Sequence, residues 1–245
     1  MNVLEVQGLT KRYPAFTLNG VSFDVPQGAV MGFIGRNGAG KSTTLKSILG
    51  MVHPDAGAVR VFGMDYAENE RVIRRELGVV LGGIDFYPKK KIKTITDVTR
   101  RFYNNWDEEK YRHYLELFHI DESKRVDQLS SGMKVKYMIA LALSHNAKLL
   151  ILDEPTSGLD PVSRDELTEL LRRVVADGTR SVLFSTHITS DLEKCATHIA
   201  FIKDGELQYT GSLDDFRTHY KDVGATLEDI IVHVERRPLD EDAII

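Results

Sequence analysis

The first sixty residues show two patterns of apolar positions. Alternating apolar and polar residues at 3–6 and 21–25 predict two strands, each with one buried face. A turn at Pro26-Gln27-Gly28 leads into the continuous apolar run 29–34, which is typical of a buried parallel strand. Residues 42–49 have helical character. The chain is therefore expected to begin with strands and to reach its first helix through residues 35–41.

From about Asp85 to Asn146 the pattern changes to helix throughout. Apolar and aromatic residues recur at helical spacing at Tyr111, Tyr114, Leu115 and Phe118. An all-helical block within a chain of strands and helices indicates an inserted subdomain.

Strands and helices alternate on both sides of this block. Such alternation predicts a mostly parallel α/β sheet. The expected strands are 59–62, 78–81, 149–152, 181–185 and 199–202, and the expected helices are 70–77, 163–175 and 189–195. After about Gly211 we expect two short helical stretches, and residues 236–245 resemble a frayed end.

Composition and charge narrow the possible partners. The 245 residues are 42% hydrophobic, as in an ordinary globular protein, and the formal net charge is −4. This charge gives no general attraction to nucleic acid, and no nucleic-acid partner is expected. The one dense basic run is Lys89, Lys90, Lys91 and Lys93, and a solvated loop is favoured over a binding role for it.

Other features bear on location. The single cysteine, Cys195, excludes an intrachain disulfide, and the polar start of the chain lacks the pattern of a signal peptide. The longest apolar runs are far shorter than the roughly 20 residues that span a bilayer. We expect a cytoplasmic protein that would serve a membrane only through a partner.

The strongest chemical signal is Gly35-Arg36-Asn37-Gly38-Ala39-Gly40-Lys41-Ser42, a full match to G-x-x-x-x-G-K-[ST] between a predicted strand and a predicted helix. Glycines allow backbone N–H groups to surround phosphates, and the helix N-terminus favours the anion. Lys41 is expected to reach the β- and γ-phosphates of ATP, and Ser42 to bind Mg²⁺. A glycine-rich structural turn would not require that lysine and hydroxyl. The expected nucleotide-binding residues here are Gly35, Asn37, Gly38, Gly40, Lys41, Ser42 and Thr43.

A second signal is the apolar strand 149–152, which is followed by two acids. In a parallel sheet the C-terminal end of a strand opens on the ligand crevice. Asp153 is therefore expected to hold Mg²⁺, directly or through water, and Glu154 to orient and deprotonate the attacking water. Alone, an apolar strand followed by acids usually means only that the strand meets solvent. The phosphate loop earlier in the same chain favours the metal-binding and catalytic interpretation.

The segment Leu129-Ser130-Ser131-Gly132-Met133 resembles the L-S-G-G-Q signature of the ATP-binding-cassette ATPases, and other motifs follow in that family's order over about residues 2–220. The resemblance implies a P-loop NTPase core with a mostly parallel sheet, an N-terminal antiparallel β subdomain and an α-helical subdomain inserted at about 85–146. It implies an ATPase domain at 1–220 and a short tail at 221–245. A plain serine N-cap is the competing explanation for the signature.

The same resemblance implies roles for further residues. Two cassettes would bind ATP head to tail, so that Ser130 and the Gly132 backbone contact the γ-phosphate held by a partner cassette. Tyr13 would stack on adenine, with a core or surface tyrosine as the alternative. His187 matches the γ-phosphate histidine, which makes Lys41, Glu154 and His187 the expected catalytic residues. Asp160 matches an acid at the dimer interface, although an N-cap role before Pro161 is also natural.

Two departures from the family pattern affect the expected activity. The family places a glutamine after the strand 78–81, where this chain has Gly82-Gly83. Water, or a nearby side chain such as Asp85, would then complete the Mg²⁺ site. The signature also has Ser131 and Met133 in place of glycine and glutamine. We expect slower or more partner-dependent hydrolysis, because the other catalytic residues are present.

The resemblance favours a subunit that binds and hydrolyses ATP to power an exporter. Its expected partners are a second cassette, identical or different, and a separate transmembrane permease at the inner face of the cell membrane. One alternative is a soluble cassette ATPase that acts on nucleic acid or ribosomes, although such relatives usually carry two cassettes or a long insertion. Another is a regulatory module that binds ATP but scarcely hydrolyses it. The residues do not identify the transported substrate.

Overall fold

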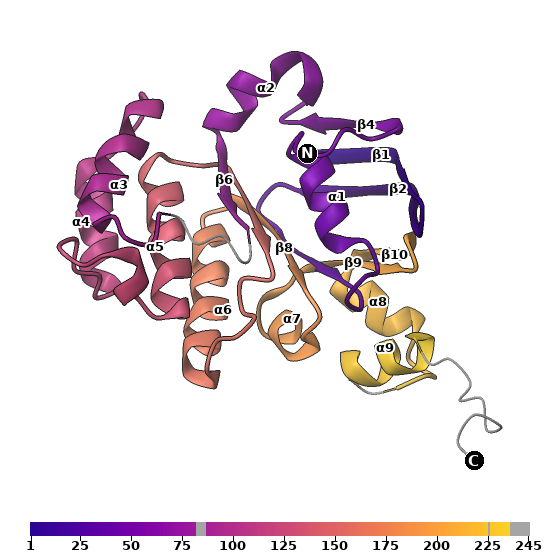
Figure 1. The fold of residues 1–245 in the computed structure, drawn as a ribbon. Helices are drawn as coiled ribbons and strands as arrows, with labels where there is room; N and C mark the ends of the chain where they lie inside the picture. Colours follow the sequence, from indigo (N-terminus) through magenta and orange to yellow (C-terminus); the bar gives the residue numbers. More distant parts are fainter. Residues whose placement is uncertain (82–86, 225, 236–245) are drawn as a thin grey trace.

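The computed structural model describes residues 1–81, 87–224 and 226–235, which form two sheets and three groups of helices (Figure 1). The first sheet is antiparallel and has the strand order β2-β1-β4-β5. Its strands are β1 (Asn2–Tyr13), β2 (Phe16–Pro26), β4 (Ala56–Val61) and β5 (Met64–Asp65). The predicted N-terminal strands are confirmed, and both continue well beyond the alternating segments.

The second sheet has six strands in the order β10-β9-β3-β8-β7-β6. All of its pairs are parallel except that between β9 and β10. Its strands are β3 (Val30–Ile34), β6 (Leu77–Val80), β7 (Leu149–Asp153), β8 (Ser181–Thr186), β9 (His198–Lys203) and β10 (Glu206–Ser212). Five strands match the predicted ones, and the mostly parallel α/β sheet is confirmed.

Helices cover both faces of the parallel sheet. On one face α1 (Lys41–Ile48) and α2 (Tyr66–Arg75) share a core with the antiparallel sheet. On the other face α6 (Pro161–Val175), α7 (Thr189–Cys195), α8 (Leu213–His219) and α9 (Leu227–Glu235) share a second core with α5. All five residues of β3 are buried between these two cores, so the phosphate loop that follows its C-terminal end starts from a fixed position.

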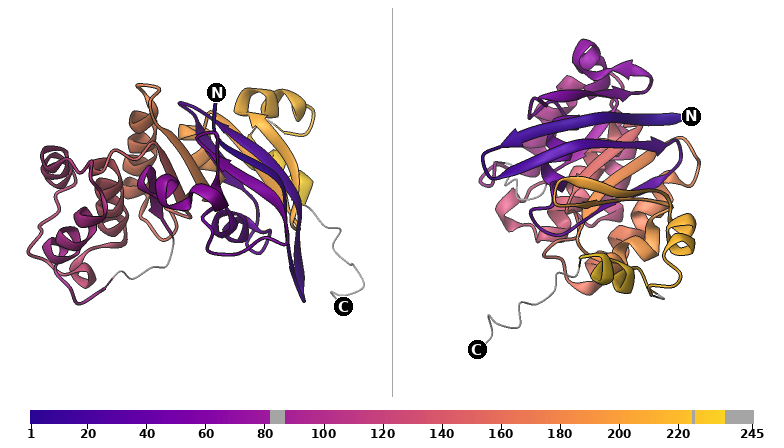
Figure 2. Two further views of the ribbon diagram at one scale, coloured as in Figure 1. Left: turned by 90° about the horizontal axis from the view of Figure 1, so that it is seen from above. Right: turned by 90° about the vertical axis from the view of Figure 1, so that its right-hand side faces the viewer.

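The helical block consists of α3 (Ile92–Thr99), α4 (Glu108–Leu117) and α5 (Ser131–Ser144), with short 3-10 turns at Arg100–Phe102 and Val126–Gln128. It has its own core, in which the Thr96 hydroxyl lies 2.7 Å from the Tyr111 hydroxyl and 2.9 Å from that of Tyr137. The block lies at one end of the molecule and α8 and α9 at the other (Figures 1 and 2). The predicted helical character is confirmed, and the proposed limits of the subdomain stay a prediction.

The C-terminal part differs from the sequence-based expectation. Strand β10 was not predicted. The two expected helical stretches are present as α8 and α9, and Leu227 and Ile230 of α9 are buried in the second core. The division at residue 220 stays a prediction, and the expected frayed end, 236–245, lies outside the described residues. Within the described part of the chain, no helix is both long and apolar enough to span a bilayer.

Candidate active site

The phosphate loop occupies residues 35–40, between the end of β3 and the start of α1. A Cβ atom on Gly35 would lie 2.3 Å from the Ile202 carbonyl oxygen, so only glycine fits there. Gly40 has a φ of 114°, in the left-handed region that glycine adopts without strain. These two glycines bring the loop close to β9 and turn it into α1, which directs the N-terminus of the helix at the site.

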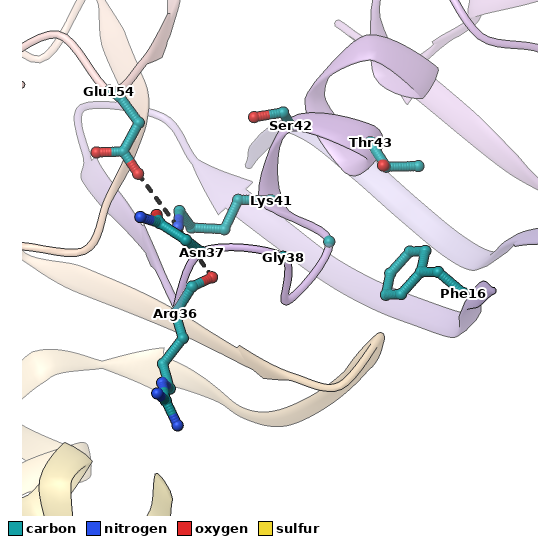
Figure 3. A pocket seen from close by; sticks show the side chains of 9 residues that line it. Phe16, Arg36, Asn37, Gly38, Lys41, Ser42, Thr43 and Glu154 are labelled. Carbon is teal, nitrogen blue, oxygen red and sulfur yellow. Dashed lines mark hydrogen bonds and ion pairs between the residues drawn. The ribbon is translucent and has the colours of Figure 1, made fainter.

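Lys41 is buried beneath the loop, with a relative exposure of 5%. Its ammonium donates to the carbonyl oxygens of Gly35 at 2.7 Å and Arg36 at 3.3 Å. It also forms an ion pair with Glu154 Oε1 at 3.1 Å (Figure 3). The lysine is therefore fixed by three oxygens, of which only the carboxylate is a charged partner that the phosphates of a nucleotide could replace.

Asp153 ends β7 beside the phosphate loop. Its Oδ1 accepts from the Ser42 hydroxyl at 3.2 Å and from the Ser185 hydroxyl at 2.6 Å. Ser42 and Asp153 thus place a hydroxyl and a buried carboxylate next to each other beside the phosphate loop. Oxygen ligands of this kind suit Mg²⁺, so the donor set fits the ion. Among the described residues, no group of three or more acidic, histidine or cysteine side chains could hold a metal by itself, so a nucleotide and water would supply the remaining ligands.

Glu154 follows β7 in an unusual backbone conformation, with a φ of 49°. Its N–H donates to the Ser185 backbone oxygen at 3.1 Å and to the Ser185 hydroxyl at 3.0 Å, which holds this conformation in place. Its Oε2 lies 2.8 Å from Nδ1 of His187, which follows the adjacent strand β8. A non-glycine residue in this region is strained, and such strain occurs often at catalytic positions.

The hollow beside the loop is lined by residues of the predicted site, by Arg36 of the loop and by one aromatic residue that was not predicted, Phe16. A Cβ on Gly40 would lie 3.0 Å from the Phe16 ring. Figure 3 shows this ring on the opposite side of Lys41 from Glu154. Tyr13 is paired with Phe16 across the β1–β2 turn but is 42% exposed and does not line the hollow. Adenine stacking by Tyr13 stays a prediction, with Phe16 as a second aromatic at the same end of the hairpin.

Comparison with known proteins agrees with this geometry. The family described as "ABC transporter" matches residues 18–157, which is more than half of the chain. The chain belongs to the ABC transporter family. The bacitracin transport ATP-binding protein BcrA of Bacillus licheniformis is 32% identical over 208 residues, covering 84% of this chain and 68% of the relative. A Nod factor export ATP-binding protein I, from Burkholderia thailandensis, is 34% identical over 208 residues, covering 82% and 68%.

A solved structure described as the ATP binding subunit of an ABC transporter superposes with a TM-score of 0.84 and 30% identity, covering 95% of this chain and 99% of that one. A cassette solved with ADP and Pi after hydrolysis superposes at 0.74, with 21% identity over 86% of this chain and 98% of that one. The P-loop NTPase fold is confirmed. This chain is an ATP-binding subunit of an ABC transporter, and its reaction is ATP hydrolysis coupled to transport.

In this ABC transporter subunit the signature residues lie at the start of α5, away from the subunit's own phosphate loop hollow. Ser130 caps the helix, because its hydroxyl accepts from the Met133 N–H at 3.2 Å, and both Ser130 and Ser131 are exposed. A Cβ on Gly132 would lie 3.3 Å from the Ser163 hydroxyl oxygen, so this glycine also allows α5 to pack on α6. The N-cap explanation for Ser130 is thus realised within one chain, and contact with a partner's ATP stays a prediction.

Asp160 likewise performs its alternative role in the single chain. Its carboxylate accepts from the Val162 and Ser163 N–H groups at 3.0 and 3.1 Å and from the Ser163 hydroxyl, which begins α6 behind Pro161. These bonds, that of the Ser163 hydroxyl first, lower the pKa of Asp160. Its exposed position leaves the dimer-interface role open as a prediction.

The residues that replace the family's glutamine, Gly82 and Gly83, lie outside the described residues, and so does Asp85. Ser185 is a residue of the candidate site that sequence reasoning missed. Its hydroxyl bonds to both Asp153 and Glu154. The sequence signal that could have found Ser185 is its position at the end of the predicted strand 181–185, two residues before His187. Strand pairing then aligns Ser185 with Asp153.

Proposed function

We propose that this subunit powers export through a separate membrane-spanning chain. The observation that carries the ATPase part of the proposal is a single bonded site: Glu154 contacts both Lys41 and His187, and Ser185 links Glu154 to Asp153. Export is supported by the relatives at 32–34% identity, whose names describe bacitracin transport and Nod factor export. An amphipathic compound or peptide is therefore the substrate class that we assign to the complete transporter.

In the proposed reaction, the backbone of residues 35–40 and the Lys41 ammonium bind the β- and γ-phosphates. Ser42 and Asp153 would hold Mg²⁺, which supplies positive charge to the phosphates. The Glu154 carboxylate orients a water molecule and accepts its proton as that water attacks the γ-phosphate. His187, 2.8 Å from Glu154, keeps this carboxylate in place, and we expect it to contact the same phosphate.

We further infer that hydrolysis requires two cassettes, identical or different. The exposed N-terminus of α5, with Ser130 as its cap, is a suitable donor to a phosphate on a facing subunit. A mixture of Lys41→Met and Ser130→Trp chains tests this arrangement for the identical case. Each variant alone should be inactive, whereas the mixture should recover part of the activity because one intact site forms in each mixed dimer. No recovery would contradict sharing of the site.

The membrane partner is proposed to contact the lysine run at 89–93. Lys89, Lys90, Lys91 and Lys93 are exposed, and their backbone is held by bonds from Asp127 N–H to Pro88 O and from Val126 N–H to Lys90 O. A basic surface on a fixed segment can pair with acidic residues of a partner. Charge reversal at Lys89–Lys91 should weaken assembly with the partner, and unchanged assembly would argue against this contact.

Co-purification from a membrane fraction tests the proposal as a whole. Tagged Glu154→Gln protein, with ATP to hold the dimer closed, should recover a multi-span membrane protein. That result would also place the subunit at the inner face of the membrane. Recovery of ribosomes or nucleic acid would favour the soluble alternative, which neither the net charge of −4 nor the transport-related relatives support.

A further inference from the structure

Helix α9 is fixed to the ATPase at both of its ends, and each end is connected to a different part of the nucleotide site. The helix lies beside α7 and α8 (Figure 1), with Leu227 and Ile230 buried in the core that α6 and α7 also line. Nothing in the proposed reaction uses this helix. Its two end contacts indicate what it contributes.

At the first end, the Leu227 N–H donates to Glu193 Oε1 at 2.9 Å. Glu193 belongs to α7, which begins two residues after His187. Helix α7 in turn packs tightly on β3, since a Cβ on Gly32 would lie 2.1 Å from a methyl carbon of Leu192. The start of α9 is therefore tied to the helix that follows the catalytic histidine.

At the second end, the Lys203 ammonium donates to the Val234 carbonyl oxygen at 2.7 Å. Lys203 is the last residue of β9, and two residues later the Gly205 N–H donates to the Ala39 carbonyl oxygen of the phosphate loop at 3.0 Å. The end of α9 is therefore tied to the turn that supports the phosphate loop.

A small hollow lies between that turn and the loop. Residues 36–39 line one side, and Asp204 and Glu235, the last described residue of α9, line the other. The Arg36 side chain points away from Lys41 (Figure 3), so it lies outside the catalytic contacts. Asp204, Glu235 and Arg36 thus border one space beside the phosphate loop.

The charges at the two ends of α9 match the helix dipole. The first N–H groups and the last C=O groups of a helix have no partner within it, and they carry partial positive and negative charge respectively. A carboxylate meets the first and an ammonium the second, so both contacts are charge-assisted and stronger than neutral hydrogen bonds. A short rigid helix held in this way fixes the separation of its two anchors.

We propose that α9 is a positioning element of the ATP site, and that Glu193 and Lys203 are its positioning residues. By joining α7 to the turn after β9, the helix holds His187 and the phosphate loop in the relative position that binds the triphosphate. The inference rests on ATP binding, which is the activity of the family, and not on export.

Glu193→Ala, Lys203→Met and the double variant test this. Binding of a non-hydrolysable ATP analogue with Mg²⁺ is measured by titration calorimetry on the whole chain, together with the melting temperature. Lys194→Met is the matched control, because Lys194 lies next to Glu193 on α7 but forms its exposed ion pair with Asp165 of α6 and not with α9. Lys203→Arg, which keeps the cation, should retain most of the affinity.

Each single variant should raise the Kd of the analogue on the order of fivefold. The double variant should raise it by about the same factor, because a helix released at one end no longer fixes the separation. The control should bind as the wild type does. Unchanged Kd with a lowered melting temperature would reduce α9 to a purely structural role and overturn the proposal. A double effect equal to the product of the single effects would also overturn it, since the anchors would then act independently.

Discussion

Replacement of Glu154 by glutamine should strengthen ATP binding by the isolated subunit. The Lys41 ammonium lies 3.1 Å from Glu154 Oε1, with relative side-chain exposures of 5% and 19%. To reach Lys41, a γ-phosphate must replace this carboxylate as the ionic partner. The gross Coulomb attraction of the pair is about 5 kcal/mol at an effective dielectric constant near 20.

Desolvation and the loss of side-chain freedom offset most of that attraction. A hydrogen bond to a charged group contributes a net stabilisation of about 1.5 kcal/mol. Removing it from the nucleotide-free state should lower the Kd for ATP roughly tenfold. Repulsion between the carboxylate and the γ-phosphate is removed by the same change and acts in the same direction.

The assay is equilibrium binding of a non-hydrolysable ATP analogue to dilute protein, so that dimer formation does not contribute. Glu166→Gln is the control, since it removes one carboxylate from an exposed ion pair with Lys136 remote from the phosphate loop. The control should bind with unchanged affinity. If Glu154→Gln binds no more tightly than the wild type, the ion pair does not compete with nucleotide and the reasoning is wrong.

Three further predictions concern single residues, two at the site and one in the helical block. Ser185→Ala removes the hydroxyl that bonds to Asp153 and to the Glu154 N–H. It should lower kcat and should raise the Mg²⁺ concentration for half-maximal activity by roughly 10- to 100-fold, measured by Mg²⁺ titration of the ATPase rate. An unchanged Mg²⁺ dependence would exclude this supporting role. Gly35→Ala should lower the melting temperature far more than Gly38→Ala, because a Cβ would clash only at Gly35, although Gly38 has a φ of 85°; equal losses would show that the close approach to β9 does not matter. Burial lowers the pKa of His145 to about 4, below its unfolded value near 6.5, so the unfolded chain binds the proton first and stability should fall by about 2 kcal/mol as the pH drops from 7 to 5. Denaturant unfolding of His145→Phe, which keeps a ring stacked on Tyr103, should lack this loss, and an equal loss in the variant would assign it to other groups.

The position of the phosphate loop and of Asp153 in the fold was predictable because each motif is a local sequence pattern fixed by backbone geometry. The phosphate loop joins a buried strand to a helix, and Asp153 ends an apolar strand, so neighbouring residues alone indicate the chemistry. Strand pairing also explains why Ser185 and Phe16 were missed. Ser185 becomes important only because β8 pairs with β7, and Phe16 only because β2 returns beside the loop, and neither relation is written in the adjacent residues.

Strand β10 was missed for a different reason. Its residues, Glu206 to Ser212, are mostly polar, and it occupies the edge of the sheet, where its side chains are only partly buried or exposed. The N-terminal strand β1 was underestimated because shifts of register near Gly8 interrupt its alternation. The dimer roles predicted for Ser130 and Asp160 stay predictions for a third reason. Both side chains cap helices within one chain, and a function shared between two chains leaves no further mark on either.

The most direct test of the central claim is the steady-state rate of phosphate release by the subunit assembled with its membrane partner, measured for the wild type and for Glu154→Gln. If Glu154 is the base that activates water, the variant should retain nucleotide binding and lose at least about 100-fold in rate. Equal rates in the two proteins would contradict the assignment of hydrolysis to this site.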